Sequence, residues 1–348
     1  MYQLKITKNT ERLALQHFNN VKGRLLIDIH HFLSGNYRTL RKETISIHGD
    51  KPSEDLLRYL SVEKNLKELI VSHPDKLRDI ISKLHSDAFD PKKNLNRILY
   101  HIFIIFGYED KRFNKDVFYR QSQVGTCPYC NMADIHYIPA TALSQPEKGV
   151  LDHFYPKEIY PILGLSFYNL IPSCPSCNDV QHKSNKDVTS NKGDASLTSM
   201  RIINPYEYQD RNFFFDYNLK SHWENAENSD VDILTAGDKE VGYNALLNLN
   251  GRYNTIQNRE TVISIIRKLN RYPDTYFDYL NMLPIPACLI KKEFDDSNEK
   301  FASRILDSIV GQYLSFNRCN YSLRSRLCSL CGFSERETLK ASQQELLS

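Results

Sequence analysis

The chain has 348 residues, of which 41% are hydrophobic and 25% charged, with 13 Gly and 14 Pro. This composition is typical of a globular protein and excludes collagen-like and low-complexity disordered chains, while the length predicts two or three domains. The net charge is only +3, so overall charge alone does not indicate a nucleic-acid-binding protein.

The longest apolar stretch, residues 98–108, contains His101 and is too short to cross a bilayer. The first residues include Lys5 and Lys8 and have no apolar block of signal-peptide length, which argues against secretion. We therefore expect a cytoplasmic protein without membrane contact. Disulfides are improbable in that compartment, so the eight cysteines need another explanation.

Residues 1–120 are predicted to be mainly helical. Apolar residues recur at spacings of three and four within residues 13–29 and again within residues 56–84, and turn signals such as His73-Pro74 separate the helices. This region has a net charge of +7, whereas the rest of the chain has −4. A basic region suits contact with a phosphate backbone, and the alternative is a solvated helical surface rich in Lys.

The character of the sequence changes between residues 121 and 205, where Pro, Cys, Asn and His become frequent and helical periodicity nearly vanishes. Helical patterns return after Tyr206 and again within residues 301–347. The predicted fold is mainly α with a small central α+β module. Its predicted parts are a helical N-terminal region (1–120), the central module (121–205) and a helical C-terminal region (206–348).

Two CxxC motifs, Cys127-Pro-Tyr-Cys130 and Cys174-Pro-Ser-Cys177, lie within the central module. Four thiolates at about 2.3 Å form a closed tetrahedral zinc site, which can structure a segment with few apolar residues. A thioredoxin-like redox role is the alternative, but neither motif lies between a clear strand and helix. The remaining cysteines could form a second zinc site, although free core thiols suit their surroundings better: Cys288, Cys319, Cys328 and Cys331.

Asp152 and His153 follow a short predicted strand that Pro156 ends. The two side chains therefore lie next to each other and point to opposite faces of that strand. Asn178 and His182 are four residues apart in a helix expected after the second CxxC motif, so they would share one face of that helix.

This pattern resembles the HNH, or ββα-metal, nucleases, and specifically their branch in which two CxxC pairs bracket the catalytic hairpin. The match covers residues 124–190. The resemblance implies that His153 is the general base, that Asp152 and Asn178 bind the catalytic divalent metal, and that Asn169 orders the loop that orients His153. Asn178 stands where this family usually has its third His.

The chemistry of phosphodiester hydrolysis supports these residue types independently. An imidazole can accept the proton of the attacking water, and hard oxygen ligands suit Mg²⁺. His182 would add a nitrogen ligand and favour Mn²⁺, or it is a surface histidine. Three lysines are expected to contact phosphates, with solvated lysines as the alternative: Lys157, Lys183 and Lys186.

A looser resemblance connects the module, with its trailing segment at residues 249–254, to the HNH subunits of Septu-type and retron-linked antiphage defence systems. That resemblance implies an ATPase partner. The sequence therefore predicts a metal-dependent HNH endonuclease with structural Zn²⁺ and catalytic Mg²⁺ or Mn²⁺, acting on DNA in preference to RNA. The alternatives are a zinc-stabilised nucleic-acid-binding or scaffold protein without catalysis, and a nuclease that cleaves RNA or tRNA.

Overall fold

The computed structural model describes residues 3–35, 37–38, 44–111, 113–115, 118–119, 125–135, 137–141, 149–188, 201–209, 212 and 214–271. They divide into two compact units. The first comprises the described residues up to Gln209 together with Val241–Leu247, and the second comprises the other described residues from 212 onwards. The first unit contains every predicted site residue. The helices predicted within residues 301–347 and the four cysteines from Cys288 onwards lie outside the described residues.

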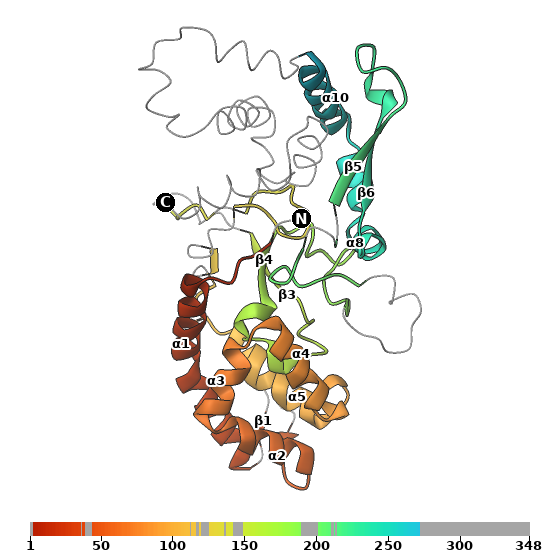
Figure 1. Ribbon diagram of the computed structural model, residues 1–348. Helices are drawn as coiled ribbons and strands as arrows, with labels where there is room; N and C mark the ends of the chain where they lie inside the picture. The colour runs from red at the N-terminus through yellow and green to blue at the C-terminus, as the bar shows by residue number, and fades with distance from the viewer. Residues whose placement is uncertain are drawn as a thin grey trace. The chain divides into compact units, whose positions relative to one another are not determined.

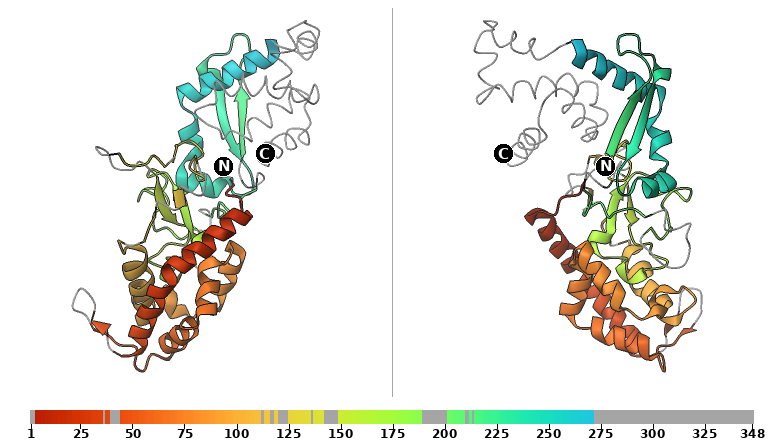
Figure 2. Two further views of the ribbon diagram at one scale, coloured as in Figure 1. Left: turned by 90° about the vertical axis from the view of Figure 1, so that its left-hand side faces the viewer. Right: turned by 45° about the vertical axis from the view of Figure 1, so that its right-hand side comes forward.

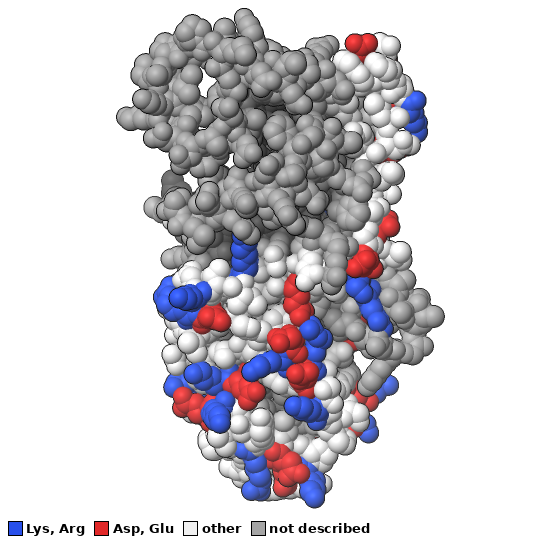
Figure 3. Space-filling model, in the orientation of Figure 1, with Lys and Arg blue, Asp and Glu red and all other residues white. Residues whose placement is uncertain are grey.

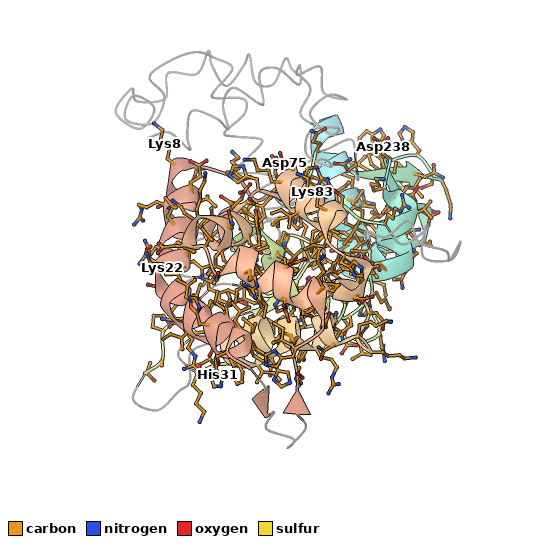
Figure 4. All side chains as sticks on the ribbon, turned by 90° about the horizontal axis from the view of Figure 1, so that it is seen from below. Lys8, Lys22, His31, Asp75, Lys83 and Asp238 are labelled. Carbon is orange, nitrogen blue, oxygen red and sulfur yellow. The ribbon has the colours of Figure 1, made fainter. Side chains whose placement is uncertain are left out.

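The first unit begins with the long helix α1 (Lys8–Leu33), which Figure 4 shows along its length from Lys8 to His31. Thr7 caps this helix, because its hydroxyl oxygen accepts a hydrogen bond from the Thr10 backbone N–H at 3.2 Å. Spacings of three and four place the buried side chains on one face: Leu13, Ala14, His17, Phe18, Leu25, Asp28, Ile29 and Phe32. The predicted N-terminal helix is confirmed.

Short helices follow, namely α2 (Lys51–Leu60), α3 (Glu63–Val71) and α4 (Pro74–Lys83), and then a 3₁₀ turn, η1 (Ser86–Phe89). α2 and α3 pack against α1 (Figure 1). The Asp50 carboxylate caps α2 by accepting hydrogen bonds from Ser53, and Pro74 begins α4, where a helix needs no N–H donor. A small sheet of β1 (Tyr37–Arg38) and β2 (Thr44–Ile45) lies between α1 and α2 in sequence.

The apolar stretch at residues 98–108 forms the end of α5 (Asn94–Tyr100) and the π-helix η2 (His101–Tyr108) that continues it. The Glu109 N–H donates to the Ile104 carbonyl oxygen, five residues back, at 2.8 Å. Ile102, Phe103 and Ile104 are fully buried. The apolar character of this stretch is therefore explained by its burial in the core of the first unit.

Two antiparallel strands carry the predicted site, β3 (Val150–His153) and β4 (Leu170–Ser173). Their register pairs Val150 with Ser173 and His153 with Leu170. The connection between them contains the 3₁₀ turns η3 (Pro161–Leu163) and η4 (Phe167–Asn169). The predicted helix after Cys177 is not formed, because residues 177–188 make successive turns. The structure therefore contains an antiparallel hairpin at the predicted site, without the helix expected after it.

Charged residues of both signs are interspersed on the part of the N-terminal helices that faces the viewer in Figure 3. Ion pairs join some of the charged residues of the first unit, such as Lys22 with Glu63 at 2.6 Å and Arg78 with Glu207 at 2.6 Å. The excess of basic residues in this region is therefore not gathered into one basic patch on the face shown.

The second unit is built on a two-stranded ribbon of β5 (Phe214–Leu219) and β6 (Val231–Ala236), with a 3₁₀ turn, η6 (Asn228–Asp230), before β6. The helices α9 (Leu249–Tyr253) and α10 (Ile256–Arg271) pack on β6, and Figure 2 shows α10 beside the ribbon. α8 (Glu240–Leu247) contributes all but its first residue to the first unit.

The described chain thus combines helices with small antiparallel sheets, as the predicted fold class requires in its coarse form. None of the described helices combines the length and the apolar character that are needed to cross a membrane.

Candidate active site and metal centre

The two CxxC motifs bring their four cysteines into one buried cluster. All four sulfur atoms lie within 4.8 Å of one another, and the Cys130 and Cys174 Sγ atoms are 3.9 Å apart. Each motif forms a tight turn in which a backbone N–H points back to the first cysteine: Asn131 N–H donates to Cys127 O at 2.8 Å, and Cys177 N–H donates to Cys174 O at 3.1 Å. The cluster can therefore hold a metal ion, as predicted from the spacing.

The chemistry of the thiols agrees with this arrangement. Hydrogen bonds with Cys127 lower the pKa of Cys130 and of Cys174, which favours their thiolate forms. Burial raises the pKa of Cys127, and hydrogen bonds with the other three cysteines raise that of Cys177. The thiolate is the form that binds a metal. Because the cysteines are buried, negative charge on several of them needs a compensating cation.

Asp152, on β3, is only 2% exposed and is held through one carboxylate oxygen. The Tyr129 hydroxyl, from the first CxxC turn, donates to Asp152 Oδ2 at 2.6 Å, and Lys183 Nζ lies 2.8 Å from the same oxygen. The other oxygen, Oδ1, has no hydrogen-bond or ion-pair partner among the described residues. Asp152 can therefore still offer one oxygen to a cation.

Lys183 is fully buried, with a side-chain exposure of 0%. Besides its ion pair with Asp152, its ammonium group donates to the His153 carbonyl oxygen at 2.7 Å. The contact with phosphate predicted for Lys183 does not fit this position, because the ammonium group is enclosed by protein and already paired. Burying an unpaired ammonium group costs free energy, so the carboxylate of Asp152 is needed to stabilise Lys183 at this position.

His153, the last residue of β3, is 7% exposed and lies on the other side of the strand from Asp152's partners. Its Nε2 atom is 3.0 Å from the Gly164 carbonyl oxygen, and the Tyr108 ring lies edge-on against it, with 4.4 Å between centroids. A carbonyl oxygen only accepts, so Nε2 carries the proton and Nδ1 keeps its lone pair. Burial lowers the pKa of His153 to about 3, which leaves the imidazole neutral at neutral pH.

Asn169 is fully buried and joins the two ends of the connection between the strands. Its side-chain oxygen accepts a hydrogen bond from the Tyr155 N–H at 2.7 Å, and its amide nitrogen donates to the Leu163 carbonyl oxygen at 3.0 Å. The backbone carbonyl of Asn169 also accepts from the Phe154 N–H at 2.9 Å. These bonds fix the backbone that follows His153.

Asn178 and His182 do not share a helix face, since residues 177–188 form turns. Both residues are half-buried. Asp179 organises this segment, because its backbone and side-chain oxygens accept from the N–H groups of His182 and Gln181 at 3.0 and 2.9 Å. The Lys183 N–H donates to the Cys177 carbonyl oxygen at 3.2 Å, which returns the segment to the second CxxC turn.

The other two predicted phosphate contacts are both engaged. Lys157 Nζ donates to Glu109 Oε1 at 2.9 Å, and this side chain remains about a quarter exposed. Lys186 Nζ donates to the Gln181 carbonyl oxygen at 2.9 Å. Each ammonium group has three N–H donors, so these single bonds leave further donors for a phosphate.

Three contacts of the site were not predicted from the sequence. Tyr129 lies inside a CxxC motif, where its tyrosine resembles an ordinary spacer, and Tyr108 ends an apolar stretch that resembles core. Gly164 packs so closely that a Cβ atom would collide with Ile104. Of these three residues, Gly164 alone gave a sequence signal, because a glycine can mark a position where the backbone has no room for a side chain.

The chain was compared with protein-family models, with curated proteins and with solved structures, and none of them matches it.

Proposed function

We propose that this protein is a metal-dependent endonuclease of the HNH type that hydrolyses phosphodiester bonds in nucleic acid, with DNA as the preferred substrate. The arrangement of His153 carries this proposal. A neutral imidazole at the end of β3 donates Nε2–H to a loop carbonyl, next to a carboxylate with one available oxygen, in a hairpin attached to a four-cysteine cluster. We assign structural Zn²⁺ to that cluster, because four thiolates suit zinc.

His153 serves as the proton acceptor. Its Nε2–H bond to Gly164 leaves the Nδ1 lone pair to take a proton from a water molecule. The low pKa that burial gives His153 makes it a weak base in the free protein. A phosphate group nearby would raise that pKa, because an opposite charge favours the imidazolium form.

Asp152 is the first ligand that we assign to the catalytic divalent cation, through Oδ1, with Asn178 and His182 completing the set. The fit is supported by the available Asp152 oxygen and by the hard oxygen donors that Mg²⁺ and Mn²⁺ accept. When bound, the cation would neutralise negative charge that develops on the phosphate and on the leaving oxygen. Lys157 and Lys186 are assigned to positioning the substrate's phosphates.

The decisive experiment compares His153→Ala with the wild-type chain in a plasmid-nicking assay containing Mg²⁺ or Mn²⁺. We expect the variant to lose cleavage by at least about 100-fold while its zinc content stays unchanged. His222→Ala is the matched control, since His222 is exposed in the second unit, and this variant should cleave like the wild type. Equal cleavage by His153→Ala and wild type would contradict the proposal.

A protein without catalysis is the second candidate, and one observation favours it. Lys183 already neutralises Asp152, as a structural ion pair would. That candidate predicts no cleavage by the wild type on any substrate and nucleic-acid binding that does not depend on His153. Running the same assay on RNA tests the third candidate, an RNA-cleaving enzyme.

The looser resemblance to defence-system subunits supports one further proposal, that the nuclease acts in the cytoplasm together with an ATPase. Co-purification of the tagged chain with the product of an adjacent ATPase reading frame would test it. Recovery of the chain without any ATPase would contradict it.

A further inference from the structure

The connection between β3 and β4, residues 154–169, is called the hairpin loop here, and three helices outside the hairpin hold it. Asn96 of α5 donates to the Ile159 carbonyl oxygen at 3.4 Å. The Ser166 hydroxyl donates to the Leu69 carbonyl oxygen, at the end of α3, at 2.8 Å. His17 of α1 binds the Leu165 carbonyl oxygen at 2.7 Å. The N-terminal helices therefore act as a frame for the loop.

The bond made by His17 is enclosed in the core. The residue is 5% exposed, and its ring contacts three aromatic rings edge-on or tilted, with centroids 5.3 to 6.1 Å away: Phe113, Phe118 and Phe167. Since a carbonyl oxygen only accepts, Nε2 of His17 is the donor. Burial lowers the pKa of His17 to about 4, so the ring stays neutral and keeps this single proton at neutral pH.

Two buried histidines thus donate to consecutive carbonyl groups of the same loop. His153 binds the carbonyl of Gly164, and His17 binds the carbonyl of Leu165. The two carbonyls belong to consecutive rigid peptide units that meet at the Leu165 Cα, so a displacement of one moves the other as long as packing holds the two backbone dihedrals of Leu165. Packing also restrains this part of the loop, because Gly164 packs directly on Ile104 and Leu165 packs on Gly107 of η2.

We infer that His17 is a positioning residue for the proposed nuclease: by holding the Leu165 carbonyl it fixes the Gly164 carbonyl, and thereby the orientation and tautomer of His153. This inference rests on the proposed function and deepens it. It gives the N-terminal helices a role in the chemistry that does not require them to touch nucleic acid. A lost or shifted bond would leave His153 Nε2 without its fixed acceptor, so Nδ1 would no longer be the only proton acceptor.

Two substitutions separate the hydrogen bond from the packing. His17→Phe retains an aromatic ring among Phe113, Phe118 and Phe167 but cannot donate. His17→Gln loses the ring but keeps a donor, because its amide nitrogen extends about as far from the backbone as Nε2 of His. The full-length protein is measured in three ways: hydrogen exchange of the hairpin loop, ¹⁵N NMR of the His153 tautomer, and steady-state cleavage with Mn²⁺.

For His17→Phe we expect faster exchange in the hairpin loop, a mixture of His153 tautomers, and kcat reduced about 10- to 100-fold with little change in KM. His17→Gln should restore most of kcat and the single tautomer. Ser166→Ala, which removes a second bond to the frame, should show the same changes at smaller size, and it serves as the test if His17→Phe does not fold.

Wild-type exchange and an unchanged His153 tautomer in a folded His17→Phe, or in Ser166→Ala if that variant is the test, would overturn the inference. The absence of cleavage by the wild type would instead contradict the proposed function, and exchange and tautomer would still decide whether His17 positions His153.

Discussion

The two ends of the β3–β4 hairpin are stabilised by different means. At the open end, where Val150 pairs with Ser173, the chain leads directly into the second CxxC turn and the cysteine cluster. At the closed end, where His153 pairs with Leu170, the hairpin loop packs against the N-terminal helices through buried hydrogen bonds. One end thus carries a set of metal ligands, whereas the other end depends on packing against the buried helices of the N-terminal region.

The open end should respond most strongly to removal of the zinc that we propose for its cysteine cluster. Chelation of zinc, or Cys130→Ser with Cys177→Ser, should unfold the two CxxC turns and the open end of the hairpin, because structural zinc contributes about 10 kcal/mol or more to small sites. Zinc content and near-UV circular dichroism measure this effect. Cys288→Ser with Cys319→Ser is the control and should leave one zinc per chain. Full retention of tertiary structure after chelation would show that packing alone maintains this end.

Lys183 connects the two ends, since it reaches from the segment after the second CxxC turn to Asp152 and to the His153 carbonyl. Lys183→Met should lower the free energy of unfolding by about 3–5 kcal/mol, because it leaves a buried carboxylate unpaired. Adding Asp152→Asn should recover part of this loss. Urea denaturation measures both variants, with Lys67→Met as an exposed control. Additive losses in the double variant would argue against a direct pair.

The closed end should be the acid-sensitive one. The pKa of His17 is about 4 in the folded protein and 6.5 in the unfolded chain, so the unfolded state takes up the proton first as the pH falls. The stability supplied by neutral His17 is complete above pH 6.5 and is lost between pH 6.5 and about 4. The loss amounts to about 3 kcal/mol.

His17→Phe should reduce this pH dependence, which denaturation series at pH 7, 5.5 and 4 would show. Any remaining dependence of the unfolding free energy on pH would come from other groups. His153 is one of them, because burial lowers its pKa as well. If the free energy of unfolding of His17→Phe depends on pH as that of the wild type does, the wild-type His17 ring does not titrate from a buried position.

Local sequence patterns were sufficient to predict those elements whose structure depends on residues close together in the sequence. The apolar spacing of α1, the break between helices at His73-Pro74 and the clustering of the two CxxC motifs could all be predicted. The helix expected after Cys177 was wrong, because hydrogen bonds centred on Asp179 and the burial of Lys183 favour turns there. The π-helix at Tyr108 has no recognisable sequence signal, since such helices are rare and depend on surrounding contacts.

By itself the sequence determined the metal-ligand spacing, the short strand that ends in Asp152 and His153, and the helical character of the N-terminal region. Only the tertiary structure decided that Lys183 pairs with Asp152, that Tyr129 shares the same oxygen, and that His17 and His153 hold adjacent carbonyls. The physical reason is distance along the chain. His17 and Leu165 are 148 positions apart, and no local pattern encodes a bond whose geometry depends on the packing of every helix between them.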